Sequence, residues 1–403
     1  METLLPDVSR HPYYISTPPY VQTSAGIRVL HLLCHWLNLR GERAFVVPSS
    51  HSPRPQSPDL LTPLLVPEIL EHHERQGKLP IVIYPETEAG NRLQADFVVR
   101  YVLNTPGHLA GEKIFSPRDL VWAYSEYLRT KCERCDGVLH MPVVDQNLFR
   151  PDPAARRKGV VFYAAKYRQV HGQEPFGMPE DAIEITRDVP GSQSPREIAR
   201  LLQTCETFYC FENTAMAIEA VLCGTPAVFM PNDYLEKPIA LDELGWDGYA
   251  WGNSAAEVAR ARATVVKGQE NYERLIGRFH DQLAGFVLAT QGKASERQAT
   301  RTMSGEKAEP SEFVVIGTPK SVSRDLLNDV VPAERQAPAP TPLPDFPVLQ
   351  VIDTFSSREI AATIRNRNKW RFHEWFRIVR ALNMVAVRSI LRFLGLARRS
   401  DSR

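Results

Sequence analysis

Residues 211–226, FENTAMAIEAVLCGTP, combine residue types that can hold a diphosphate and a ribose. The stretch predicts a helix with a polar start that is followed by an apolar strand. The first N–H groups of a helix lack internal partners, and the helix dipole adds positive charge there, so a diphosphate is expected at the amides of Thr214, Ala215 and Met216. The Glu219 carboxylate can accept two hydroxyl hydrogen bonds side by side, as a ribose requires. The pattern indicates a nucleotide diphosphate site, and the alternative is an ordinary capped helix.

The N-terminal part must supply the other side of such a site. From Tyr13 the chain reads as strand, loop, helix, turn and strand, and Gly26 stands where the loop enters the helix, so a ligand can approach the backbone closely. The strand PIVIYP leads into a polar loop, and we predict an amphipathic helix that contains Phe97, Val98, Tyr101 and Val102. Ligands bind beyond the carboxyl ends of parallel strands, which makes the loop residues the candidates on this side: Glu88, Asn91 and His108.

A second strand–helix unit follows a turn-rich bridge over residues 138–153. It comprises strands near 159–165 and 181–186, a basic loop with Lys166 and Arg168, and a helix that starts after Ser194. Strands that alternate with helices twice over predict an α/β fold of two doubly wound parallel sheets, with the ligand in a cleft between them. We assign residues 1–145 to a Rossmann-like acceptor-side domain and 146–290 to a Rossmann-like donor-binding domain.

The last hundred or so residues differ in composition. Residues 291–355 are polar and Pro/Ala-rich, which predicts a linker around a short ordered piece. Residues 356–403 predict a helix with arginines on one face and aromatic and aliphatic residues on the other. This pattern is typical of a helix in the interface of an anionic membrane, here over residues 356–399. The alternative is a helix that packs on the protein's own N-terminal sheet.

Composition limits the partners. The 403 residues are 43% hydrophobic and 24% charged, and the net charge of +1 gives no reason to expect a nucleic-acid partner. No signal peptide or spanning segment is evident, so we expect a cytoplasmic protein, peripheral on the inner face of the membrane. Of six cysteines only Cys132 and Cys135 form a CxxC pair, without the second pair of a zinc site. We therefore expect no metal and no cofactor.

Three segments carry a family resemblance. They are the loop Ser24-Ala25-Gly26 with the helix that follows it, the bridge MPVVDQNLFRP, and the segment FENTAMAIEAVLCGTPAVFMP. Together they resemble bacterial glycosyltransferases of the two-Rossmann-domain type (GT-B), in the retaining superfamily that builds surface polysaccharides from nucleotide sugars. The resemblance covers roughly residues 10 to 290. It implies a hexosyltransferase whose donor is a nucleotide sugar and whose acceptor is a polysaccharide or lipid-linked glycan.

The resemblance also implies residue roles. Glu219 is similar to the family glutamate that binds the donor ribose, and Lys166 to the basic residue that neutralises the leaving diphosphate, a role that Arg168 could share. Asn213 joins this donor-binding set, whereas Glu212 and His108 complete the catalytic candidates. The family places seven residues between its two glutamates, but six separate Glu212 from Glu219. Either Glu212 acts from a shifted loop or its function is absent, and the alternative is a carboxylate that stabilises a helix dipole.

Two other functions fit the same pattern. A nucleotide-sugar 2-epimerase would share the architecture and need no acceptor. A catalytically silent module would bind a nucleotide and use the tail to recruit partners to the membrane.

Overall fold

The computed structural model describes residues 10–187 and 189–304. The predicted membrane-binding helix over 356–399, and the linker beyond residue 304, lie outside the described residues. Among the described residues, no helix is both long and apolar enough to cross a membrane.

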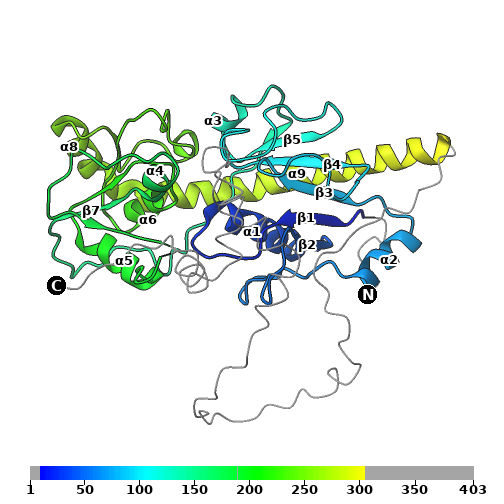
Figure 1. The fold of residues 1–403 in the computed structure, drawn as a ribbon, viewed down its shortest axis with the longest axis horizontal. Helices are drawn as coiled ribbons and strands as arrows, with labels where there is room; N and C mark the ends of the chain where they lie inside the picture. Colours follow the sequence, from blue (N-terminus) through cyan, green and yellow to red (C-terminus); the bar gives the residue numbers. More distant parts are fainter. Residues whose placement is uncertain (1–9, 188, 305–403) are drawn as a thin grey trace, which may run out of the picture. The chain divides into compact units, whose positions relative to one another are not determined.

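The first sheet has six strands, and all of its pairings are parallel. Its order is β2-β1-β3-β4-β5-β6, of which Figure 1 labels β1 to β5. The strands are β1 (Tyr13–Thr17), β2 (Ala44–Pro48), β3 (Ile81–Pro85), β4 (Val98–Val102), β5 (Leu120–Ala123) and β6 (Gly137–Val138). The helices of this part are α1 (Ala25–Leu39), α2 (Pro67–Arg75) and α3 (Glu126–Arg129).

Burial on both faces explains why these strands are short apolar runs. In β1 every residue is buried, with Tyr13 and Ile15 in one hydrophobic cluster and Tyr14 in another. Successive side chains of a strand point to opposite faces, so the two clusters lie on the two sides of the sheet. Helix α1 covers one side through a buried stripe at helical spacing: Val29, Leu30, Leu33, Cys34 and Leu37.

The prediction of a helix around Phe97 to Val102 is wrong. Residues Val98–Val102 form β4, which lies between β3 and β5, and all five are buried. The run VVRYV is rich in β-branched and aromatic residues, which fit a pleated surface, and burial on both faces removes the polar alternation that would reveal an exposed strand.

The second sheet has five strands in parallel pairings, in the order β11-β10-β9-β7-β8. The strands are β7 (Val160–Tyr163), β8 (Ile183–Glu184), β9 (Thr207–Cys210), β10 (Ala227–Phe229) and β11 (Tyr249–Trp251). Its helices are α4 (Ala165–Gln169), α5 (Pro195–Thr204), α6 (Met216–Leu222), α7 (Leu241–Leu244) and α8 (Ala255–Thr264), with a 3₁₀ turn at Val265–Lys267. The predicted α/β fold of two doubly wound parallel sheets is thus confirmed.

Local signals in the second unit behave as predicted at one helix and differ at another. Ser194 caps α5 in a full capping box with Glu197, and Pro195 occupies the first helical position. The expected basic loop after β7 is instead the short helix α4, which contains Lys166 and Arg168. A helix of five residues is too short to show a hydrophobic period, so the sequence gives no sign of it.

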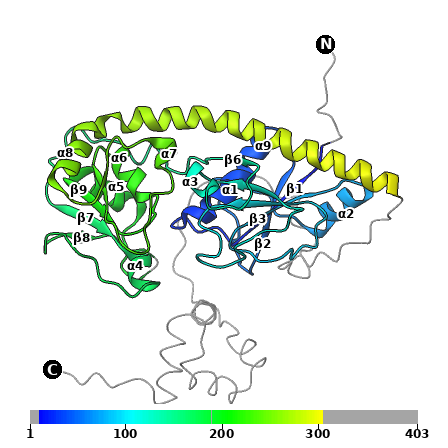
Figure 2. The same ribbon diagram turned by 90° about the horizontal axis from the view of Figure 1, so that it is seen from above.

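Helix α9 (Gly268–Ser304) is one continuous helix of 37 residues (Figure 2). Its buried side chains recur every three or four positions, at Tyr272, Leu275, Phe279, Leu283, Phe286, Thr290 and Ala294. Residues 291–304, where a linker was expected, are its last turns. This end is anchored to the first sheet, because Thr290 Oγ1 and the Tyr13 hydroxyl are hydrogen-bonded at 2.8 Å.

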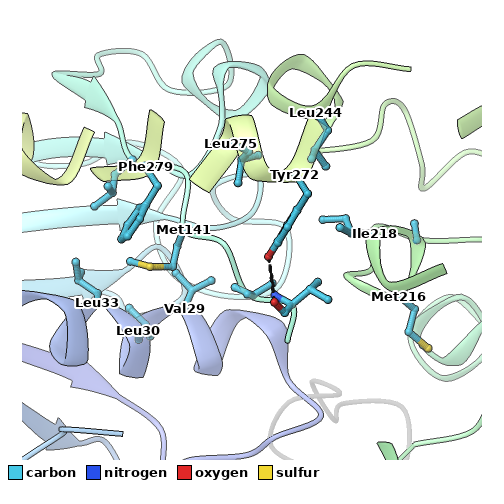
Figure 3. Close-up of a cluster of buried hydrophobic side chains, with 14 of the residues drawn as sticks. Val29, Leu30, Leu33, Met141, Met216, Ile218, Leu244, Tyr272, Leu275 and Phe279 are labelled. Atoms are coloured by element: carbon cyan, nitrogen blue, oxygen red, sulfur yellow. Dashed lines mark hydrogen bonds between the residues drawn. The ribbon is translucent and has the colours of Figure 1, made fainter. Parts of the chain in front are cut away.

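The first half of α9 joins the apolar cluster in which helices of both sheets meet. Figure 3 shows Val29 and Leu30 of α1, Ile218 of α6 and Leu244 of α7 around Tyr272. The hydroxyl of Tyr272 accepts a hydrogen bond from the backbone N–H of Val144 at 2.9 Å, within the bridge between the sheets. Both α1 and α6, the helices that carry Arg28 and Glu219, contribute side chains to this shared core.

Candidate functional site

The strand orders place a topological switch point in each sheet. After β1 the next strand is added toward one edge of the first sheet, and after β3 toward the other edge. In the second sheet, β7 and β9 are followed by strands toward opposite edges in the same way. Ligands of such sheets bind outside the carboxyl ends of the strands at these points. The residues that follow those four strands include Arg28, Glu86, Lys166 and Glu212, so both switch points are lined with charge.

Glu219 connects the two sheets through arginines. The glutamate is 1% exposed on α6, and its Oε1 lies 3.5 Å from Nη2 of Arg28 on α1. Its Oε2 lies 3.4 Å from Nη2 of Arg187, which follows β8. Arg187 Nη1 also donates to the carbonyl oxygen of Thr23 at 3.0 Å. Both carboxylate oxygens of Glu219, the residue predicted to bind the ribose, therefore face guanidinium groups.

Glu212 caps helix α4. Its Oε2 accepts the backbone N–H of Lys166 at 2.5 Å and that of Tyr167 at 3.2 Å. Burial raises the pKa of the carboxyl group, whereas the charge of Lys166 and the two N–H donors lower it. The carboxylate thus accepts hydrogen bonds from amides that would otherwise be unpaired at the start of α4. This is the dipole-stabilising role considered for Glu212 as the alternative to catalysis, but the stabilised helix is α4 and not α6.

The positive charge of Lys166 influences Glu86 and His108, two residues of the first-sheet part. Its exposed side chain lowers the pKa of Glu86, which follows β3, and of His108. Burial is the larger cause in both cases, and it raises the pKa of Glu86 to about 7 and lowers that of His108. The rings of His108 and His171 lie 6.0 Å apart. The catalytic candidates Lys166, Glu212 and His108 are therefore in one electrostatic neighbourhood.

The other donor-side candidates are engaged in local structure. Arg168 donates to Glu174 at 3.1 Å and to Glu184. Asn213 accepts the N–H of Ile239 at 2.8 Å and donates to the carbonyl oxygen of Lys237 at 3.2 Å.

The start of α6 is already capped in part. Helix α6 starts at Met216 with Ala215 as its cap residue, and the Met216 N–H donates to Thr214 Oγ1 at 3.3 Å. One of the three amides expected to hold a diphosphate therefore has an internal partner, and the helix has only seven residues.

The acceptor-side candidates Glu88 and Asn91 build the loop after β3. Glu88 accepts from Ser16 Oγ at 2.5 Å and from Arg92 Nε at 2.8 Å. Asn91 holds Ala95 through both of its amide atoms, at 2.8 and 2.9 Å. Gly26 lies in the first turn of α1, where an added Cβ would meet only Leu103 Cδ1 at 3.9 Å, so this face has room.

A cavity of about 510 Å³ lies in the first-sheet part, away from these residues. Asn91 is the only candidate among its lining residues, which include Asp96, Arg100, Asp119 and Arg297. Its central charges are already paired, since Arg100 Nε and Asp119 Oδ2 are 2.8 Å apart. Chemistry and topology point to the strand ends, so we do not place the site in this cavity.

Among the described residues, no group of three or more His, Cys, Asp or Glu side chains is placed so that it could hold a metal ion. Cys132 and Cys135 are half-buried free thiols, and burial raises the pKa of both.

Sequence reasoning did not single out Arg28 or Arg187 as a site residue, and it placed Glu86 on the functional edge without a role. Each follows the carboxyl end of a parallel strand, directly or after a short loop. This position is the signal that could have found them, because parallel strands deliver such residues to one edge. The pairing of Arg28 with Glu219 had no such signal.

Comparison with solved structures gives similarity to glycosyltransferases. SnogD from Streptomyces nogalater is 11% identical, with 70% of this chain and 99% of that chain covered at a TM-score of 0.40. WaaG, a glycosyltransferase involved in lipopolysaccharide biosynthesis, is 7% identical, with 70% and 100% covered at a TM-score of 0.40. Anabaena Alr3699/HepE in complex with UDP-glucose is 12% identical, with 73% and 100% covered at a TM-score of 0.33. No protein-family model and no curated protein matches the chain.

Proposed function

We propose that the chain is a glycosyltransferase that uses a nucleotide-sugar donor. The observation that carries the proposal is the meeting of charged residues from the switch points of both sheets, with Arg28 of the first 3.5 Å from Glu219 of the second. A donor with a diphosphate needs cations and amide donors at one place, and a sugar acceptor needs a second surface beside it. Two parallel sheets whose strand ends share one electrostatic neighbourhood supply both.

The transfer requires a bond change at the anomeric carbon of the donor sugar. An oxygen of the acceptor hydroxyl forms a bond to that carbon, the bond from the carbon to the diphosphate oxygen breaks, and the diphosphate keeps the electron pair. The hydroxyl proton passes to a base. Lys166 is suited to stabilise the departing charge, because its ammonium group is exposed at the end of β7.

The narrower parts of the proposal rest on the sequence. They are a hexosyl group, transfer with retention, a polysaccharide or lipid-linked glycan as acceptor, independence from metal ions, and a location at the inner face of the membrane through residues 356–399. Glu212 does not add to the case for retention, because its carboxylate caps α4.

The test is a thermal-shift and calorimetry screen of the full chain with nucleoside diphosphates that differ in base. A ligand at a hundred times its dissociation constant stabilises the folded state by about 2.7 kcal/mol, a readily measured shift. One base should bind, and the matching nucleotide sugar should release its diphosphate when acceptor glycans are added. If no nucleoside diphosphate binds at millimolar concentration, the proposal is wrong.

Two lysines at opposite ends of β7 provide a matched pair for the activity. Lys166→Gln should lower the turnover about a hundredfold, since it removes a fixed cation from the leaving group. Lys158→Gln changes an exposed lysine that precedes the strand and should leave turnover unchanged. Equal activity of the two variants would remove Lys166 from the site, and nucleotide binding without any turnover would favour the silent module.

A further inference from the structure

Arg28, Arg187 and Glu219 form a buried charge cluster at the site. The side chains of the two arginines are 12% and 10% exposed, and that of the glutamate is 1% exposed. Figure 3 shows Val29 and Ile218, which adjoin Arg28 and Glu219 in the sequence and belong to one hydrophobic cluster. The helices that carry Arg28 and Glu219 are therefore anchored in one core.

The cluster carries excess positive charge. An arginine stays protonated in proteins, so two guanidinium groups face one carboxylate. A buried charge without a counter-charge is costly, so the excess of one guanidinium group over the carboxylate favours the binding of an anion.

The unused hydrogen-bond donors point to the same conclusion. Arg28 Nε and Nη2 and Arg187 Nε are buried, and none of the three makes a hydrogen bond within the described part of the chain, although Arg28 Nη2 forms an ion pair with Glu219. Nε and Nη2 share one edge of a guanidinium group, the edge that binds carboxylate or phosphate oxygens in pairs. Buried polar atoms are nearly always hydrogen-bonded, which makes three orphaned donors in one cluster unusual.

Glu219 occupies these edges only in part. Its Oε2 accepts a long hydrogen bond from Arg187 Nη2 at 3.4 Å, and its Oε1 lies 3.5 Å from Arg28 Nη2, whereas charge-assisted hydrogen bonds are about 2.7–2.9 Å. One carboxylate between two guanidinium groups leaves both edges with capacity for a further oxyanion.

We propose that Arg28 and Arg187 bind the diphosphate of the donor, each through its Nε and Nη2 edge. The inference rests on the proposed function and deepens it, because it assigns the anion site to residues that neither the sequence pattern nor the family resemblance indicated. A diphosphate suits the cluster since two phosphate groups offer oxygens to two guanidinium edges, one from helix α1 and one from the segment that follows β8. Arg168 is less suited, because both of its contacts are made to glutamates.

The arginines also come from different sheets, so the ligand would join the two halves of the site. Arg28 belongs to α1 of the first unit, and Arg187 follows β8 of the second while holding the Thr23 carbonyl of the first. Binding of the diphosphate should therefore require both arginines together, and the loss of either should remove most of the affinity.

The experiment measures affinity by calorimetry on the full chain. The probes are the nucleoside diphosphate that the screen selects, its nucleoside, and inorganic pyrophosphate. Arg28→Gln and Arg187→Gln should each weaken the diphosphate and pyrophosphate at least tenfold and leave the nucleoside within twofold. Arg129→Gln, a half-exposed arginine on α3, is the matched control and should bind like the parent protein.

Two further measurements keep the result interpretable. Arg28→Lys retains the charge beside Glu219 but loses the paired edge, so it should fold and still bind the diphosphate several-fold more weakly. A nucleotide sugar with a carboxylate on the sugar is compared with its neutral counterpart, because a sugar carboxylate is the other oxyanion of this chemistry. If the arginine variants lose only the preference for the acidic sugar, the assignment to the diphosphate is overturned.

The failures are distinguishable. If the parent protein binds a nucleoside diphosphate and both Gln variants bind it within twofold, the arginine assignment is wrong and the proposed function stands. If the parent protein binds no nucleoside diphosphate, both fall.

Discussion

The carboxylate of Glu212 accepts the backbone N–H of Lys166 at 2.5 Å. The bond ties the end of β9 to the first turn of α4, so the residue predicted to catalyse positions the backbone of the residue predicted to stabilise the leaving group. A carboxylate that is committed to two amides, those of Lys166 and Tyr167, has a structural reason to be present whatever else it does.

Replacement of Glu212 separates the structural role from charge. Glu212→Ala leaves two helix amides without an acceptor, which should lower the free energy of unfolding by about 1–3 kcal/mol relative to Glu212→Gln, whose amide oxygen can still accept. Urea denaturation of both variants at pH 7 measures the difference. Equal stability of the two variants would show that the cap contributes nothing.

The buried carboxyl group of Glu86 should make the stability of the folded protein depend on pH. Burial raises its pKa from 4.5 to about 7, so the folded protein binds this proton more tightly than the unfolded chain. The resulting stabilisation is complete below about pH 4.5 and is lost as the pH rises through 7, and a shift of this size corresponds to roughly 3 kcal/mol.

Glu86→Gln should remove that part of the decline between pH 5 and pH 8 while keeping an acceptor for the Leu103 N–H. Glu243, whose pKa burial also raises to about 7, should account for a further decline, which Glu86→Gln leaves in place. The measurement is chemical denaturation at four pH values for the parent and the variant. An identical slope for both would contradict the assignment of a raised pKa to Glu86.

The sequence allowed the positions of many strands to be predicted but not all of the helices. Strands such as β1 and β9 are short apolar runs between turn signals, and helix α6 with Glu219 follows β9 as the sequence predicts. In β4 the positions of Val98, Tyr101 and Val102 fit a helical period as well as a strand, and only burial on both faces decides between them.

The contacts of the site residues were beyond sequence reasoning. Arg28 meets Glu219 because α1 and α6 pack on a core to which Tyr272 of α9 contributes, and no local period encodes a contact between such distant segments. The composition of residues 291–304 suggested a linker, yet the buried Ala294 continues the stripe of α9 beyond Thr290. Few buried positions in a polar stretch are enough to extend a helix that is already nucleated.

Lys166 should control the ionisation of His108 across the site. Its charge disfavours the protonated imidazole, so Lys166→Gln should raise the pKa of His108 toward its ordinary value, whereas burial, the larger cause, remains. Histidine ring signals followed by NMR between pH 4 and 8, assigned with His108→Gln, give the shift. His73, whose pKa burial, Arg43 and His72 lower to about 4, is the internal control. No movement of the His108 pKa would mean that the two side chains are farther apart in solution.

Gly111 and Gly41 make a matched pair for the loop that leads from β4. Both have a positive φ, of 78° and 83°, a conformation that costs an L-residue about 1 kcal/mol. An added Cβ at Gly41 meets nothing within 4 Å, whereas at Gly111 it would overlap the backbone carbonyl oxygen of Glu86.

Gly41→Ala should therefore lower the free energy of unfolding by about 1 kcal/mol. Gly111→Ala should cost more than this and displace the loop that carries His108. Thermal unfolding together with the His108 NMR signal tests both effects. If the two variants lose equal stability and His108 keeps its chemical shift, the loop does not pack on Glu86 as the structure describes.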